Sequence, residues 1–166
     1  VAAGLESTSP ERLNIVLRDK LQRLNTPVSE TLLGGSTPNS TRLQPITLGE
    51  VHNIEPLLTN PALHEYQCHA GAIEGVIEVR ADGVPRTITT SGVSAGSFRL
   101  TASPEGTITA SVQGRTPYVN TVSNIVQVLA TAYGTPSERF TSGDLDNAQL
   151  SAFNTAHPQP VGIHIS

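Results

Sequence analysis

The run from Gly92 to Gly96 matches the G-x-S-x-G pattern, in which a serine can act as the nucleophile of a hydrolase. That chemistry needs Ser94 in a sharp turn between a strand and a helix, because the helix N-terminus supports the oxyanion site. The residues that follow, Ser97–Leu100, favour a strand instead. We therefore interpret the glycines as part of a connection between strands, and a serine hydrolase using Ser94 is the second alternative function.

Two kinds of side chain downstream could assist Ser94. Asp144 and either His157 or His164 follow it in the chain order of serine hydrolases. However, Asp144 and Asp146 stand two residues apart at the predicted start of a helix, where capping and the helix dipole explain carboxylates better than an acid–base pair does. The scattered histidines are more typical of surface or packing positions than of ligands.

The run from His64 to His69 combines two imidazoles with the only cysteine, Cys68. The histidines are five residues apart, so a helix would not place both on one face, as H-E-x-x-H does. On a strand, His64, Tyr66 and Cys68 share one face and His69 lies on the other. A half-buried strand with Cys68 as a small apolar residue is therefore favoured over a metal site or a thiolate nucleophile. We predict no catalytic, cofactor-binding or metal-binding residues, and no enzyme.

Length, charge and composition exclude several other classes of protein. The 166 residues fit one domain or two small ones, and a single cysteine excludes an internal disulfide framework. A formal net charge of −4 argues against a nucleic-acid-binding surface. No apolar run approaches the ~20 residues needed to span a bilayer. No signal peptide is visible, so the sequon Asn39–Thr41 is expected to be coincidental.

The predicted strands, helices and loops divide the chain into three parts. Residues 1–41 form a lead-in strand or turn and a polar loop. Residues 1–11 are small and polar, and Thr8 with Glu11 forms a possible capping box. Alternating and helical spacings overlap over residues 13–24, so we expect a strand at 12–18 that runs into a helical turn at 19–24.

Residues 42–115 are predicted to form a β-rich module, a small antiparallel sandwich or barrel. Short strands are expected at residues 46–48, 57–58, 64–69 and 73–80. In the last of these, Ile73, Gly75, Ile77 and Val79 alternate with Glu74, Val76, Glu78 and Arg80, which is typical of a half-buried strand. Asp82-Gly83 predicts a tight hairpin into a strand at 84–90, where Pro85 indicates an edge. Residues 97–101 and 107–113 are expected to pair with each other across a proline-containing turn.

Residues 116–166 are predicted to hold two helices and a terminal strand, which makes the fold class α+β. Thr121 can cap a helix that ends before Gly134 and whose apolar face holds Val122, Ile125, Val126, Leu129 and Tyr133. A second helix is expected over about 145–156, with Ser142 and Asp144 as cap candidates and an apolar side of Leu145, Ala148, Ala152 and Phe153. Residues 161–165 predict a final strand, and a chain that stops within a strand is expected to be a fragment of a longer one.

A family resemblance rests on nine short stretches within residues 12–166: Arg18–Pro27, Leu48–Leu58, Tyr66–Gln67, Arg80–Pro85, Phe98–Leu100, Pro104–Ala110, Val126–Tyr133, Asp144–Asp146 and His157–Gly162. Together they resemble segments of the large tail-tip or baseplate hub proteins of long-tailed bacteriophages. The resemblance implies a structural part of a virion tail, made in the bacterial host cytoplasm. It also implies other phage tail proteins as partners and a homo-oligomer in the assembly. It supplies no catalytic residues.

Such a protein is expected to act through subunit interfaces, and edge strands are the surfaces most suited to that role. The candidate edges are Pro85–Thr90 and Val161–Ile165. The alternative function is a receptor- or carbohydrate-binding β-module, although three phenylalanines, three tyrosines and no tryptophan offer few rings for sugar stacking.

Overall fold

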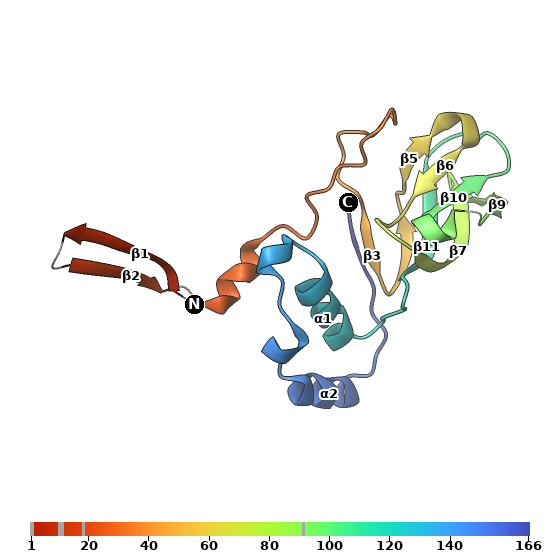
Figure 1. Cartoon of the computed structure of the whole chain (residues 1–166). Helices are drawn as coiled ribbons and strands as arrows, with labels where there is room; N and C mark the ends of the chain where they lie inside the picture. The colour runs from red at the N-terminus through yellow and green to blue at the C-terminus, as the bar shows by residue number, and fades with distance from the viewer. Residues whose placement is uncertain (1, 10–11, 18, 91) are drawn as a thin grey trace.

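A computed structural model describes residues 2–9, 12–17, 19–90 and 92–166 and shows a mixed α+β fold (Figure 1). The described residues form two four-stranded antiparallel sheets, two two-stranded sheets and two α-helices, and the last element is a strand. The predicted fold class is therefore confirmed. Short 3₁₀ helices join the larger elements: η1 (Lys20–Asn25), η2 (Pro61–Leu63), η3 (Val93–Ala95), η4 (Pro136–Glu138) and η5 (Ser142–Asp144).

The first four-stranded sheet has the order β4 (Glu50–Ile54), β11 (Ile108–Arg115), β7 (Ile73–Ala81) and β8 (Val84–Pro85). Asp82 and Gly83 both have positive φ, 47° and 82°, which confirms the predicted tight hairpin between β7 and β8. The predicted single strand at 84–90 is wrong, because β8 ends at Pro85 and Ile88–Thr89 pairs in the other four-stranded sheet. The Asp82 carboxylate also accepts the backbone N–H of Thr107 at 2.8 Å, so the turn is fixed to the start of β11.

A β-bulge in β7 overturns part of the predicted alternation. The register against β11 shifts between Glu78 and Val76, which leaves Ile77 unpaired. Ile77 is consequently 49% exposed, although the alternate spacing placed it with the buried residues, and Val76 packs against the core instead. A bulge inserts one residue and so reverses the faces on one side of it.

The second four-stranded sheet has the order β5 (Leu57–Asn60), β6 (Glu65–Gln67), β10 (Ser97–Leu100) and β9 (Ile88–Thr89). The predicted pairing of 97–101 with 107–113 is wrong, because β10 pairs with β6 and β9 while β11 pairs with β4 and β7. The connection crosses from one sheet to the other, which lets the apolar residues of both strands face a shared core.

That shared core makes the β-rich part a sandwich. Its centre is Phe98, which is fully buried and stacks on Tyr66 with ring centroids 5.8 Å apart. The other buried members come from both sheets and from the loop after β6: Val51, Ile54, Cys68, Val79, Ala81, Leu100, Ile108, Ala110 and Val112.

A second core joins the helical segment to the sandwich. The terminal strand β12 (Ile163–Ile165) pairs antiparallel with β3 (Ile46–Leu48), and α1 (Val122–Ala132) packs on this pair through Ile125. Gly49, after β3, has φ +72°, and a Cβ there would collide with the carbonyl of Val161. Only glycine allows the chain leading to β12 to lie this close.

The helix ends depart from the predicted caps. Thr121 occupies the N-cap position of α1, but its hydroxyl makes no capping hydrogen bond. Asp144 forms a capping box with Thr141 on η5 and does not cap the second helix, α2 (Asn147–Ala156), and Ser142 lies within η5. Asp146 caps α2, because its carboxylate accepts the backbone N–H of Gln149 at 3.0 Å. Gly134 has φ +76°, the left-handed conformation expected after the end of a helix.

Replacing Asp146 with alanine is expected to lower the free energy of unfolding by about 1 kcal/mol, the usual cost of a lost N-cap. Urea denaturation followed by far-UV circular dichroism measures it. Asp146→Asn retains the accepting oxygen and should lose no more than a few tenths of a kcal/mol. Equal losses in both variants would contradict the capping role.

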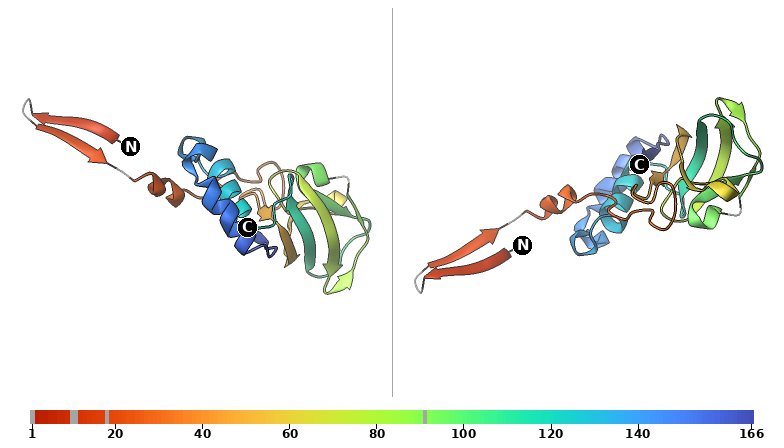
Figure 2. Two further views of the ribbon diagram at one scale, coloured as in Figure 1. Left: turned by 90° about the horizontal axis from the view of Figure 1, so that it is seen from below. Right: turned by 90° about the horizontal axis from the view of Figure 1, so that it is seen from above.

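The N-terminal part forms a two-stranded ribbon, β1 (Ala2–Ser9) and β2 (Arg12–Leu17), which projects from the rest of the chain (Figures 1 and 2). Thr8 lies in β1 and not at the start of a helix, whereas Glu11, the other member of the predicted capping box, lies outside the described residues. The predicted strand at 12–18 is confirmed as far as Leu17, and Arg18 is also outside them. The helical turn at 19–24 is confirmed as η1, capped by Asp19.

Candidate functional site

The G-x-S-x-G run does not form a nucleophile elbow. Ser94 lies in the 3₁₀ helix η3 and is followed directly by strand β10. Gly96 has φ +77°, and a Cβ there would collide with the carbonyl oxygens of His69 and Gly71. The second glycine is thus required for tight packing of a turn, as the strand-connection interpretation predicted.

The structure does not bring the predicted partners of Ser94 together. The carboxylate of Asp144 accepts hydrogen bonds from Thr141 and forms an ion pair with Lys20, and these interactions hold its pKa well below the ordinary value. His164 contacts Thr47, 2.8 Å from its hydroxyl. These side chains are committed to separate structural contacts.

The His64–His69 run likewise separates its side chains. His64 has φ 47° and ends the 3₁₀ helix η2, whereas Cys68 is fully buried. Burial raises the pKa of the Cys68 thiol to about 12, so the thiol is neutral and a poor nucleophile at pH 7. Among the described residues, no group of three or more His, Cys, Asp or Glu side chains could hold a metal ion.

Two other candidates have structural contacts. His157 packs on Phe153 with ring centroids 4.7 Å apart. The side-chain nitrogen of Asn39, the atom that a glycan would modify, donates to the Leu58 carbonyl at 2.8 Å. Asn39 therefore ties the polar loop to β5.

A buried polar cluster lies where β3, α1 and β12 meet, and sequence reasoning missed it. Thr47 is fully buried at the centre of β3 and donates its backbone N–H to Nδ1 of His69 at 2.9 Å. The Thr47 hydroxyl lies 2.6 Å from the Cys68 carbonyl oxygen and 2.8 Å from Nδ1 of His164. Nε2 of His69 is 3.4 Å from the hydroxyl of Tyr133.

Burial shifts the titration of both imidazoles. It lowers the pKa of His69 to about 4, with further lowering by the positive charges of Arg115 and His164. Burial also lowers the pKa of His164. Alternation had placed His69 opposite Cys68, but β6 ends at Gln67, and both residues are buried in the following loop. The available signal was a threonine between an isoleucine and a leucine in one short strand.

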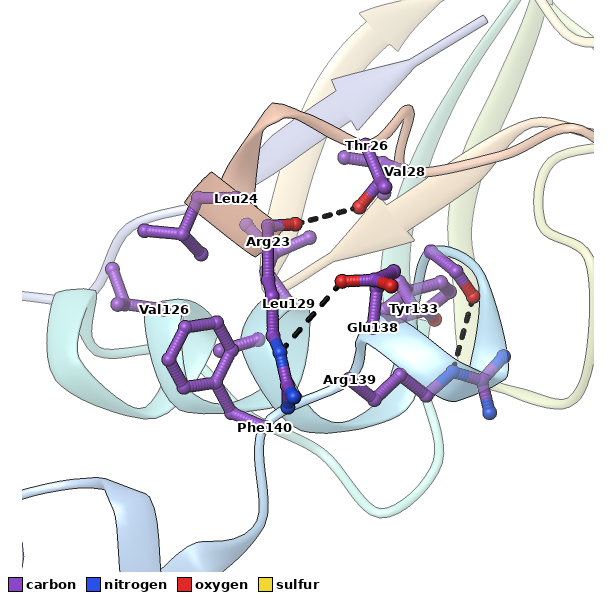
Figure 3. A pocket seen from close by; sticks show the side chains of 12 residues that line it. Arg23, Leu24, Thr26, Val28, Val126, Leu129, Tyr133, Glu138, Arg139 and Phe140 are labelled. Carbon is purple, nitrogen blue, oxygen red and sulfur yellow. Dashed lines mark hydrogen bonds and ion pairs between the residues drawn. The ribbon is translucent and has the colours of Figure 1, made fainter. Parts of the chain in front are cut away.

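A small cavity of about 270 Å³ lies between η1, α1 and residues 134–140 (Figure 3). Leu24, Val126 and Phe140 contribute apolar walls. At its rim, Nε of Arg23 lies 3.7 Å from a carboxylate oxygen of Glu138. This arrangement packs η1 against α1 and combines an apolar interior with an ion pair at the rim.

The outer face of α2 is also apolar. Phe153 is 44% exposed and lines an open hollow of about 530 Å³ with Leu145, Leu150 and Ala156. The predicted apolar side of this helix is therefore largely uncovered, since Ala148 and Ala152 are exposed as well. No helix within the described ranges is long and apolar enough to cross a membrane.

No protein-family model, no curated protein and no solved structure matches the chain.

Proposed function

We propose that this chain is a structural component of a bacteriophage tail tip or baseplate, resembling a hub protein, and that it acts through protein–protein interfaces in virion assembly and host attachment. Its place would be the virion tail, among other tail proteins and further copies of itself. The resemblance of the short stretches over residues 12–166 supports this proposal. The observation that carries the assembly role is the projecting β1–β2 ribbon.

The ribbon lacks the support that a sheet of this size needs. It is a two-stranded sheet of its own, and within the described residues neither strand has an extensive contact with another element. A two-stranded hairpin alone is marginally stable in water, and a third strand or a packed face is needed for independent stability. A strand of a neighbouring tail protein would supply this.

The two edges of the ribbon differ in their suitability for such pairing. The register places extra residues in β1 at Ala3 and Thr8, whereas β2 continues without interruption from Arg12 to Leu17. A bulge disrupts the row of backbone N–H and C=O groups and so hinders pairing with a further strand, whereas a regular strand presents that row without interruption. We therefore assign β2 as the edge that accepts a neighbouring strand.

Other surfaces support an assembly role. β8 and β9 each end a sheet, and β12 pairs on one side only in the described chain. Val84 and Ile165, on two of these edges, are 55% and 38% exposed. Val84 lies next to the candidate edge Pro85–Thr90, and Ile165 lies within the candidate edge Val161–Ile165. Subunit interfaces commonly bury exposed apolar side chains of this kind.

The sugar-binding alternative gains less support, because carbohydrate modules stack sugars on exposed rings. Tyr66, Phe98 and Phe140 are buried and Tyr118 and Tyr133 are half-buried, so Phe153 is the one exposed ring among the described residues. We therefore carry only the structural proposal forward.

Immunogold labelling and mass spectrometry of purified phage tails test the proposal. The parent polypeptide should be present in the tails, and the label should fall at the tail tip. Label on the capsid, or absence of the polypeptide from virions, would reject a role in the tail.

A further inference from the structure

The hydrogen bonds of the buried polar cluster fix the protonation state of both imidazoles. Because the Thr47 N–H donates to Nδ1 of His69, that nitrogen is unprotonated and Nε2 carries the proton. The Thr47 hydroxyl has one proton, and the carbonyl of Cys68 can only accept it. The hydroxyl oxygen must then accept from Nδ1–H of His164.

This assignment leaves Nε2 of His164 as a bare acceptor. The atom is buried and has no hydrogen-bond partner among the described residues. A proton arriving there would create a buried cation without an acceptor. A proton on Nδ1 of His69 would face the Thr47 N–H donor to donor, so that hydrogen bond would break.

The surrounding groups offer little compensation for these charges. Arg115 of β11 is the ion that most affects His69, and it is positive. Cys68 and Tyr133 are both neutral at pH 7, since burial raises the pKa of each. Glu30 and Arg139, which carry opposite charges, line a neighbouring cavity that Tyr133 also lines.

The cluster lies at the contact that holds the terminal strand. Thr47 and His164 are direct partners in the β3–β12 pair, which has only three residue pairs. His69 occupies the other side of β3, where it receives the Thr47 N–H. Loss of these contacts would therefore loosen β12 and leave the sandwich core between β7, β11 and β10 intact.

We propose that Thr47, His69 and His164 form an acid-sensitive latch: the neutral imidazoles hold β12 on β3, and their protonation releases β12 while the β-sandwich stays folded. This inference is independent of the tail proposal. The sign follows from proton linkage, because the opened site binds protons more tightly than the closed one. Stability of the latch is therefore full above pH ~6.5, the usual pKa of an exposed histidine, and is lost as the pH falls toward ~4.

Hydrogen–deuterium exchange of the full chain, corrected for intrinsic exchange rates, tests the latch. Between pH 7 and pH 5, the opening constant of the β3 and β12 amides should rise about 20-fold, as expected for one histidine shifted from ~6.5 to ~4. Amides of β7 and β11 should change less than about twofold. A uniform change across the chain, or none in β12, would overturn the proposal.

Variants separate titration from packing. Asn can accept from the Thr47 N–H and donate to its hydroxyl without titrating, so His69→Asn with His164→Asn should reduce the acid response to less than about twofold. His52→Asn, at an exposed histidine beside Glu50, should retain the full response. An unchanged acid response in the double variant would overturn the latch.

Proton titration of the wild-type chain by NMR provides a second test that does not depend on how the variants fold. His69 should titrate near pH 4, well below the ~6.5 that is usual for an exposed imidazole. A midpoint of 6–7 for His69, the range of exposed imidazoles, would contradict the proposal.

Discussion

Replacing Phe98 with alanine is expected to lower the free energy of unfolding by about 3–5 kcal/mol. Phe98 is fully buried between the two sheets of the sandwich and stacks on its cross-strand partner Tyr66. Truncation removes a large apolar surface and leaves a cavity that two hydrogen-bonded sheets cannot easily close. Urea denaturation monitored by circular dichroism measures the loss.

The matched control is Phe153→Ala on the outer face of α2. Phe153 is 44% exposed, so its truncation should cost less than about 1 kcal/mol. If Phe98→Ala cost no more than this control, the packing of β10 against β11 across the core would be wrong.

A proline at position 15 is expected to remove most of the chain's incorporation into phage tails. Ile15 lies in the middle of β2, and proline there removes one ladder N–H and disturbs the flanking pairs. Loss of two hydrogen bonds at about 1 kcal/mol each corresponds to about a 30-fold loss of affinity. Quantitative mass spectrometry of purified tails, with wild type and variant competing, measures incorporation.

Ile15→Val is the control, because valine has high β propensity and keeps the backbone N–H. It should enter tails as the wild type does. The unfolding transition of the sandwich should be unchanged within about 0.5 kcal/mol in both variants. Normal incorporation of Ile15→Pro would exclude β2 as the pairing edge.

Local signals in the sequence predicted the elements where one physical requirement dominates. Asp82-Gly83 predicted a hairpin because few other residues accept two successive positive φ angles. The helical face containing Ile125 and Leu129 predicted α1, and these residues do pack toward the second core. The terminal strand was likewise predicted from its own alternation.

Features that depend on long-range pairing were missed. Alternation in residues 97–113 is compatible with a local hairpin and with strands in opposite sheets, and burial of Phe98 and Val112 in one core between the sheets favours the second arrangement. A bulge at Ile77 has no local signature here. The ribbon strand β1 consists largely of small and polar residues, which offer little β propensity, so pairing with β2 is the only reason to assign it.

The polar cluster escaped prediction for a related reason. Thr47, His69 and His164 are separated by 22 and 95 residues in the chain, and only the return of β12 to β3 brings them together. Local spacing also placed His64 in a strand, whereas it ends the 3₁₀ helix η2 and the strand begins at Glu65.

Amide exchange in residues 12–17, compared between the isolated chain and purified tails, tests the central claim most directly. We expect the outer-edge amides of β2 to exchange rapidly in the isolated chain and to become protected at least tenfold in tails, as pairing with a neighbouring strand requires. Equal exchange rates in both states would contradict a ribbon that works by joining another subunit's sheet.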